Sequence, residues 1–296
     1  MEYQHLDEAS TEIVQKPDNE RIKYILGARF IPYPETQEIL DRFTRLVDHP
    51  QIDRMPNYLL VGDTNNGKTA ILREFESRYP VTNEPPDGPS LKVLYMQAPG
   101  RADESRLYSA ILERLNSAHN DSDIASNKLK QVKHYIQSLG IKILIIDELH
   151  NIAPSTANRQ RDFLVTLKYL CNELRISIIA AGTPEVYDVI TYDKQLSNRF
   201  ETIRLPIWDN KKVEFIAFLK GYEKRLPLKK ASNLGGRDLA VKILKMGEGL
   251  LGEYVTIIKK AAELAIRSGE EKITLEILQK IPYDSPSMRS KTWPTS

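Results

Sequence analysis

Residues Gly62 to Thr69 contain the residue types that bind a phosphate chain. They fit the pattern G-x-x-x-x-G-K-[ST] in full. Glycines let the backbone curl so that successive N–H groups point at phosphate oxygens, and the dipole of a following helix favours the same anion. Lys68 would reach the β- and γ-phosphates, and the Thr69 hydroxyl would bind Mg²⁺. The predicted nucleotide-binding residues are Gly62, Asp63, Thr64, Asn65, Asn66, Gly67, Lys68 and Thr69.

A chance match is the alternative for this loop, and its surroundings argue against it. An apolar strand is predicted over residues 57–61, directly before the loop. A helix is predicted over residues 68–79, and Pro80 ends it. The sequence has no Asn-Lys-x-Asp segment of the kind that reads guanine, so ATP is favoured over GTP.

Two adjacent carboxylates form the second candidate element. Ile143 to Ile146 is predicted to be a strand buried on both faces, and Asp147 and Glu148 follow at its carboxyl end. Ligands bind at that end of the strands in an open parallel sheet. We assign Asp147 to Mg²⁺ and Glu148 to the water that attacks the γ-phosphate. A buried strand with a charged exit is the alternative for this segment alone.

Two further residues have a functional and a structural interpretation. Thr183 follows a predicted strand over residues 176–181, where it would hydrogen-bond the attacking water or the γ-phosphate, or cap the helix that begins at Pro184. Arg199 precedes a short strand predicted over residues 202–205. Oligomeric ATPases place an arginine finger at such a position. A solvated or salt-bridged arginine is the alternative there.

The order of elements predicts a parallel α/β sheet flanked by helices, with right-handed crossovers, followed by a helical subdomain. Residues 1–29 are predicted to be an extended or partly helical N-terminal arm, 30–208 the α/β nucleotide-binding subdomain, 209–281 a helical lid and 282–296 a mobile tail. Residues 81–90 are predicted to be a loop. The remaining predicted strand covers residues 91–97, and the remaining predicted helices cover 35–47, 103–116, 124–139, 158–174, 211–225, 237–246, 253–268 and 275–281.

Composition limits the classes of protein that fit. The chain has 296 residues, 41% of them hydrophobic, and a formal net charge of +2, which permits nucleic-acid binding without arguing for it. The single cysteine, Cys171, excludes an intrachain disulfide and is expected to be a core residue. No leader or membrane-length apolar stretch is evident, so we expect a cytoplasmic protein without a membrane partner.

Together the motifs resemble the AAA+ superfamily and, more narrowly, the TniB/TnsC group of transposition ATPases. The similarity spans roughly residues 20–281 and includes the nucleotide motifs above. The segments closest to this group are Phe30-Ile31-Pro32-Tyr33, Leu144 to Glu148, Ala181-Gly182-Thr183-Pro184-Glu185, Leu196-x2-Arg199-Phe200 and Gly249-Leu250-Leu251-Gly252.

The resemblance implies ATP and Mg²⁺ as cofactors and a site completed between neighbouring subunits. It also implies assembly on double-stranded DNA as a ring or helical filament, linking a TniQ-like target selector to a DDE transposase. By position, Ile31 and Tyr33 would line the adenine pocket, Thr183 would be the sensor and Arg199 the finger acting in trans. Arg101 falls where this group contacts DNA.

The region around Arg101 has further basic residues: Arg106 and, on the next predicted helix, Lys128, Lys130 and Lys133. In a ring or spiral it would face a central DNA, and we predict DNA contacts for Arg101 and Arg106. A solvated charged face is the alternative.

One position departs from the pattern. Relatives often have an arginine after the Gly-x-x-Gly turn that touches the γ-phosphate, and Glu253 stands there in this chain. Arg237 or Lys259 would have to serve instead, or the lid senses nucleotide weakly. Two other functions stay open: another AAA+ switch, replication-loader-like or signalling, that acts on a protein partner, and a nucleotide-binding module that does not oligomerise.

Overall fold

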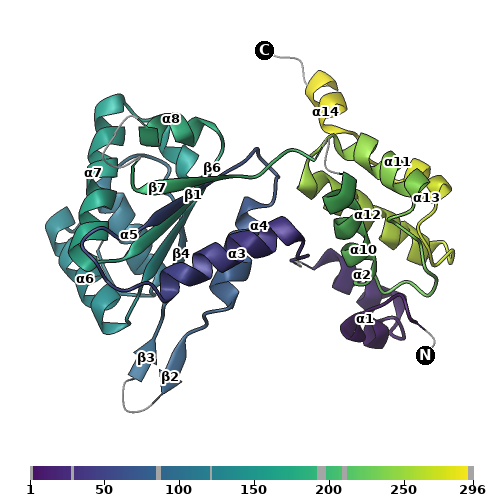
Figure 1. Cartoon of the computed structure of the whole chain (residues 1–296), viewed down its shortest axis with the longest axis horizontal. Coiled ribbons are helices and arrows are strands. Elements are labelled where there is room, and N and C mark those ends of the chain that lie inside the picture. The colour runs from purple at the N-terminus through teal and green to yellow at the C-terminus, as the bar shows by residue number, and fades with distance from the viewer. Residues whose placement is uncertain are drawn as a thin grey trace. The chain divides into compact units, whose positions relative to one another are not determined.

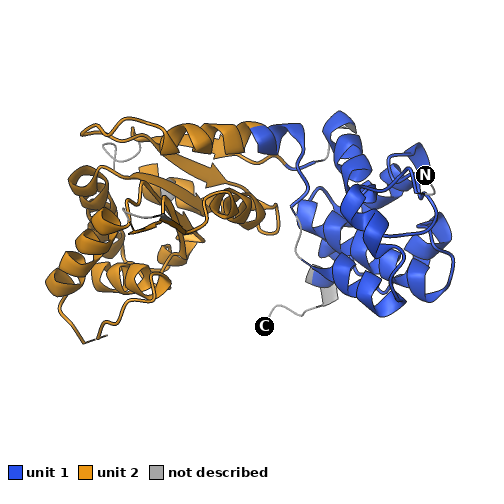
Figure 2. Ribbon diagram, turned by 90° about the horizontal axis from the view of Figure 1, so that it is seen from below, with its two compact units in different colours: residues 1–37, 207–296 blue, residues 38–206 orange. Residues whose placement is uncertain are grey.

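The computed structural model describes residues 3–27, 30–84, 88–120, 122–191, 198–208 and 212–292 (Figure 1). The chain divides into two compact units, coloured separately in Figure 2. Residues 38–206 form the α/β unit, and residues 1–37 together with 207–296 form the helical unit. Within the described ranges, no helix is both long enough and apolar enough to cross a membrane.

A parallel five-stranded sheet organises the α/β unit, in the order β4-β5-β6-β1-β7. Apolar runs explain the strands, because both faces of the sheet are covered and β5 and β6 are buried along their whole length. The strands are β1 (Asn57–Val61), β4 (Val93–Gln97), β5 (Ile143–Asp147), β6 (Ser177–Gly182) and β7 (Phe200–Arg204). This is the predicted α/β fold class, and each predicted strand is present within a few residues of its expected bounds.

Helices pack on both faces of the sheet. Alternate strand residues, such as Leu144 and Ile146, belong to an apolar cluster with α5, α6 and α7. On α3 and α4, the rings of Phe43 and Phe75 lie with their centroids 5.4 Å apart. The helices are α3 (Pro34–Val47), α4 (Lys68–Ser77), α5 (Glu104–Arg114), α6 (Ala125–Ser138), the 3₁₀ turn η1 (Leu149–Ile152), α7 (Ala157–Leu174) and α8 (Glu185–Thr191).

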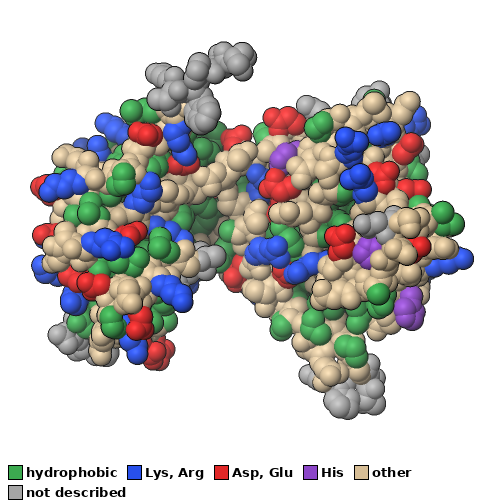
Figure 3. Space-filling model, turned by 180° about the vertical axis from the view of Figure 1, so that it is seen from behind, with side chains coloured by type: hydrophobic (Ala, Val, Ile, Leu, Met, Phe, Trp, Pro, Cys, Tyr) green, Lys and Arg blue, Asp and Glu red, His purple; other side chains and the backbone are tan. Residues whose placement is uncertain are grey.

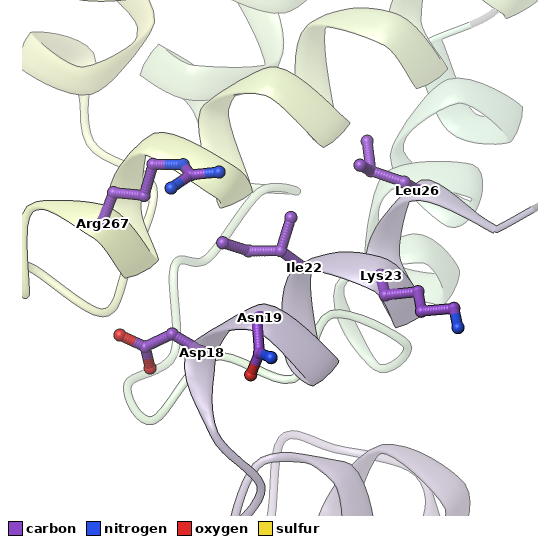
Figure 4. A pocket seen from close by; sticks show the side chains of 6 residues that line it. All are labelled: Asp18, Asn19, Ile22, Lys23, Leu26 and Arg267. Carbon is purple, nitrogen blue, oxygen red and sulfur yellow. The ribbon is translucent and has the colours of Figure 1, made fainter.

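A separate apolar core holds the helical unit together. Trp208 lies at its centre, with ring centroids 4.8 Å from Tyr33 and 5.3 Å from Phe218. A groove of about 670 Å³ is lined by Asp18, Asn19, Ile22, Lys23, Leu26 and Arg267, from α2 and α12 (Figure 4). The helices are α1 (Glu8–Ile13), α2 (Asp18–Leu26), α10 (Lys212–Glu223), α11 (Arg237–Gly247), α12 (Leu251–Arg267), α13 (Leu275–Lys280) and α14 (Pro286–Thr292).

The structure differs from the sequence prediction at three segments. The N-terminal arm forms α1 and α2 and joins the helical unit, because Ile22 and Ile25 are buried in its core. The predicted loop 81–90 contains an antiparallel hairpin of β2 (Thr82–Glu84) and β3 (Gly88–Ser90). The predicted tail contains α14. Segments this short give no readable hydrophobic period.

A buried ion pair attaches the N-terminal segment to the rest of the helical unit. The Arg21 side chain is 0% exposed, and its two terminal nitrogens donate to the Glu271 carboxylate over 2.9 and 2.5 Å. Its Nε and Nη2 also donate to the Pro227 carbonyl oxygen over 3.0 and 2.7 Å. Burial raises the pKa of Glu271, but hydrogen bonds from Arg21 and Lys229 outweigh it and leave that pKa below its ordinary value.

Replacing Arg21 by alanine should lower the free energy of unfolding of the helical unit by about 3 kcal/mol, since it removes the buried cation and leaves the Glu271 carboxylate with only the half-exposed Lys229, whose Nζ lies 3.5 Å away. Chemical denaturation followed by circular dichroism measures this. The matched control is Arg267→Ala, which removes a surface ion pair with Glu263 and should cost less than about 1 kcal/mol. Equal effects of the two substitutions would contradict the assignment.

The same pair should make stability depend on pH in the acid range. A carboxyl whose folded pKa is depressed adds stability above its unfolded pKa, and that stability is lost as pH falls through the folded pKa. Arg21→Ala should therefore flatten the acid limb of the stability profile.

Candidate nucleotide-binding site

The loop of Gly62 to Gly67 opens at the carboxyl end of β1, which lies between β6 and the edge strand β7. It follows β1, whose last residue Val61 is in register with Gly182 of β6 and Arg204 of β7. Gly67 has φ +87°, a conformation that favours glycine, and α4 begins directly after it. The N-terminus of α4 therefore lies directly at the loop. This is the arrangement that the motif predicts for a phosphate-binding site.

Lys68 is fixed over this loop. Its Nζ donates to the carbonyl oxygens of Gly62 over 2.7 Å and Asp63 over 2.8 Å. Burial lowers the pKa of Lys68, while the nearby carboxylates of Glu148 and Asp147 act in the opposite direction. The ammonium thus lies where a phosphate bound by the loop's N–H groups would meet a positive charge.

The Asp147 carboxylate is fully buried and accepts three hydrogen bonds. Its Oδ2 accepts from Thr69 Oγ1 over 2.7 Å and from Tyr95 Oη over 2.8 Å, and its Oδ1 accepts from the Glu148 backbone N–H over 2.8 Å. The structure therefore brings together Thr69 and Asp147, the two predicted Mg²⁺ ligands. A hydroxyl and a carboxylate oxygen at this separation fit a hard cation that keeps several of its waters.

Sequence reasoning missed Tyr95. It lies in β4, in register with Ile145 of β5, and the Arg73 guanidinium lies 3.5 Å from its ring centroid. Burial first, and then the Asp147 charge, raise the pKa of Tyr95. The available signal was a hydroxyl within the apolar strand Val93 to Met96, since a buried tyrosine needs a hydrogen-bond partner.

Glu148 leaves the strand in a left-handed conformation, with φ 55° and ψ 37°. Such a backbone costs a non-glycine residue of order 1 kcal/mol or more, so the surrounding structure must impose it. The Glu148 carboxylate lies 3.0 Å from His150 Nε2 and is one-third exposed. It is therefore accessible to a water molecule while being oriented by a neighbour.

Thr183 directly follows β6, whose end lies between the ends of β5 and β1. Its carbonyl oxygen accepts from the Val186 N–H over 3.0 Å, and a hydrogen bond to its side chain is the main cause that lowers the pKa of Glu185. These contacts lie at the start of α8. The capping role and the contact with the γ-phosphate both stay predictions.

Arg199 lies at the amino end of the parallel strands, whereas the loop lies at their carboxyl end. It precedes β7, and its carbonyl oxygen accepts from the N–H of Asn57, the first residue of β1, over 3.1 Å. Since β1 and β7 are parallel and five residues long, a distance of about 16 Å separates the two ends. Its Nη1 donates to Asn172 Oδ1 over 2.5 Å, and the residue is half-buried.

The predicted adenine-pocket residues belong to the helical unit. Ile31 and Tyr33 are 6% and 5% exposed and are part of its apolar core. Burial raises the pKa of Tyr33. Their adenine role stays a proposal. Residues 192–197, which include Leu196 of the predicted arginine-finger segment, lie outside the described residues.

Of the basic residues near Arg101, the structure leaves some exposed and buries another. Arg101 and Arg106 are exposed, beyond the end of β4 and in the first turn of α5. Lys128 is 2% exposed and donates to Ser105 and Ser109, so it cannot contact DNA as considered above. Lys133 pairs with Glu173 over 2.8 Å. On the face that Figure 3 shows, basic and acidic side chains are interspersed.

Glu253 is buried in the first turn of α12 and is paired within the helical unit. Its carboxylate lies 2.6 Å from Arg289 Nη2 and accepts from Tyr283 Oη over 2.7 Å. Of the two cations considered as substitutes, Lys259 donates to the carbonyl oxygens of Leu26 and Gly27. Arg237 is exposed at the start of α11.

Replacing Tyr95 by phenylalanine should raise the Mg²⁺ concentration needed for half-maximal ATP hydrolysis by about tenfold or more, because partners that orient a metal ligand affect binding to that extent. A Mg²⁺ titration of the hydrolysis rate measures this. Tyr108→Phe is the matched control, a buried tyrosine of α5. An unchanged titration in Tyr95→Phe would show that the hydroxyl does not orient Asp147.

Comparison with known proteins agrees with this geometry. The sequence profile of the family described as "Bacterial TniB protein" matches residues 21–210. The ATP-binding subunit ClpL of the ATP-dependent Clp protease from Lactococcus lactis subsp. lactis is 24% identical over 155 residues, which are 51% of this chain and 18% of that protein. The chain thus spans a small part of that relative.

Solved structures share the fold over most of the chain. Cdc6p from Pyrobaculum aerophilum superimposes with a TM-score of 0.61 at 15% identity, over 86% of this chain and 68% of that one. The ORC1 protein of Aeropyrum pernix, solved in complex with DNA, gives 0.60 at 19% identity, over 91% and 69%. Such identities show the fold alone. Since the family profile matches more than half of the sequence and the sheet has this topology, the chain belongs to the bacterial TniB family and has the fold of AAA+ ATPases.

Proposed function

We propose that this chain is an ATP-dependent, DNA-binding regulator of DNA transposition, cytoplasmic, that hydrolyses ATP with Mg²⁺ and assembles on double-stranded DNA. The observation that carries the ATPase part is the meeting of Lys68, Thr69 and Asp147 at one edge of the sheet. The transposition part rests on membership of the TniB family.

Each residue of the site has a separate role in binding or hydrolysing ATP. The N–H groups of the loop and the Lys68 ammonium bind the phosphate chain, and Thr69 and Asp147 hold Mg²⁺. Bound Mg²⁺ neutralises charge on the phosphates. Glu148 orients the attacking water, and Thr183 beside it fixes that water or the γ-phosphate. Ile31 and Tyr33 contact the adenine.

Arg199 is the arginine finger in this proposal, and it acts between subunits. It lies about one strand length from its own loop, which supports a role at the site of a neighbour rather than at its own. An interface that joins one edge of a subunit to the other edge of the next is heterologous and produces a ring or an open helix. The same geometry supports self-association as a ring or filament.

Exposed arginines support DNA as a binding partner. Arg101 and Arg106 follow β4, and the Ala102 N–H donates to Ser155 Oγ over 2.9 Å, which joins their loop to the segment that precedes α7. Arg159 and Arg161 are exposed in the first turns of α7. The related fold of the archaeal ORC1 protein was solved with DNA. On this DNA, a TniQ-like target selector and a DDE transposase are the protein partners.

Subunits that carry Lys68→Ala should lose ATP hydrolysis because ATP binding is lost, whereas subunits with Arg199→Ala should bind ATP and fail to hydrolyse it. Mixing the two should restore about a quarter of the wild-type rate, since random heterologous interfaces then combine an intact loop with an intact arginine. A phosphate-release assay over the mixing ratio measures this.

The control for Arg199 is Arg175→Ala, an exposed arginine at the same edge that pairs with Asp53. It should leave turnover unchanged. Full activity of Arg199→Ala alone would overturn the intersubunit site and favour a nucleotide-binding module that does not oligomerise.

DNA affinity should fall steeply with salt, with a slope of about −0.9 in log–log units for each phosphate contacted. Replacing both Arg101 and Arg106 by alanine should reduce that slope by about 2. Fluorescence anisotropy with a labelled duplex at several salt concentrations measures it. Lys92→Ala is the control, because Lys92 is exposed before β4 and therefore at the other edge of the sheet. No duplex binding by the wild type would favour an AAA+ switch that acts on a protein partner.

A further inference from the structure

One side chain of the phosphate loop points away from the phosphate site. Asn66 is 1% exposed, and its Nδ2 donates to the carbonyl oxygens of Leu205 over 3.3 Å and Pro206 over 3.1 Å. Its backbone lies between two positive-φ residues, Asn65 at 64° and Gly67 at 87°. The Asn66 amide therefore joins the most sharply turned part of the loop to a different segment of the chain.

That segment is the end of the α/β unit. The Leu205 N–H donates to the Val61 carbonyl oxygen over 2.8 Å, which prolongs the pairing of β7 with β1. Pro206 has no N–H to donate, and the chain passes to the helical unit after it. The two carbonyls that Asn66 holds are therefore the last fixed backbone groups before the chain enters the helical unit.

The other end of the connection is equally fixed within the helical unit. The Trp208 N–H donates to the Gly249 carbonyl oxygen over 3.1 Å, and the Trp208 ring is 2% exposed among aromatic neighbours. A Cβ at Gly249 would lie 2.2 Å from Ile207 Cγ2, and the φ of +88° also requires glycine there. Only one residue, Ile207, thus lies between the two anchored groups, the Pro206 carbonyl and the Trp208 N–H.

We propose that Asn66 is a positioning residue that couples nucleotide occupancy of the phosphate loop to the path of the connection, residues 205–208, and so to the placement of the helical unit. This inference rests on the proposed ATPase function. When the loop's N–H groups turn to bind phosphate, the backbone of residues 65–67 moves with them. The two hydrogen bonds of Asn66 pass that movement to the carbonyls of Leu205 and Pro206.

The chemistry of the contact requires an amide. Both acceptors are carbonyl oxygens, and the asparagine NH₂ group supplies two donors, one for each. An aspartate of the same shape would place acceptors against acceptors in a buried position. Asn66→Asp therefore removes the coupling contact while leaving the backbone of the loop and the Lys68 side chain in place.

The test measures the distance between the units with and without nucleotide. Spin labels are placed at Lys130→Cys and Lys280→Cys, both exposed, in a background that carries Cys171→Ala. The distance between the two labels is then measured by double electron–electron resonance in nucleotide-free protein and in protein with a slowly hydrolysed ATP analogue. We expect a shift in the wild-type background. In Asn66→Asp, compared at an analogue concentration that saturates each variant, we expect that shift to be lost, because the two hydrogen bonds to Leu205 and Pro206 are gone.

Two further variants keep the test decisive. Gly249→Ala disturbs the connection at its other anchor without touching the loop, so it should also abolish the shift with an unchanged Kd. Asn19→Asp makes the same chemical change at an exposed position and should behave as wild type.

The outcomes separate this inference from the proposed function. Failure of the wild type to bind the analogue would refute the ATPase proposal itself. Binding with no shift in the wild type, or a wild-type shift in Asn66→Asp, would refute only the coupling role of Asn66. If Asn66→Asp does not fold, persistence of the shift in Gly249→Ala gives the same refutation.

Discussion

The buried carboxylate of Asp147 is the constraint on which the α/β unit depends. An ionised group removed from water destabilises the fold unless hydrogen bonds replace its hydration. Asp147 obtains them from the Thr69 hydroxyl, the Tyr95 hydroxyl and the Glu148 N–H. These donors come from α4, from the neighbouring strand β4 and from the turn after β5. Three features therefore place a donor beside the Asp147 carboxylate: the order of the strands, the start of α4 and the left-handed backbone at Glu148. The predicted Mg²⁺ site lies at the same carboxylate.

In a parallel sheet, the carboxyl ends and the amino ends of the strands form two chemically different sides of the subunit. The carboxyl edge carries the phosphate loop and both carboxylates, whereas the amino edge carries Arg199. Close packing at the carboxyl edge also explains Gly182, since a Cβ there would lie 3.3 Å from the His150 nitrogen and 3.1 Å from Val186. In the function we propose, the phosphate loop and Arg199 are the two parts of one hydrolytic site, and they lie at opposite ends of the strands. A second copy of the chain would then supply the missing part, so that hydrolysis would depend on assembly.

Local signals made the phosphate loop, the five strands and most helices predictable, because glycines, prolines and apolar runs act within a few residues. Contacts between distant residues were not predictable. The arm of residues 1–29 joins the helical unit through Arg21 and Glu271, which are 250 positions apart. Lys128 seemed to be a surface cation and is buried against two serines of another helix. The motif placed Asn66 in the loop correctly, but whether its side chain faces phosphate or the connection depends on Leu205 and Pro206, which no local pattern links to it.

Glu253, which departs from the family pattern, is neutralised by contacts within the helical unit. A glutamate in the first turn of α12 interacts favourably with the helix dipole, but in a buried position it also needs a cation. Arg289 supplies that charge, Tyr283 adds a hydrogen bond, and α14 is thereby held on the helical unit. The pair is neutral as a whole, so it neither attracts nor repels a phosphate strongly. Of the two cations considered as substitutes, Lys259 is held by the carbonyl oxygens of Leu26 and Gly27, and Arg237 is exposed at the start of α11.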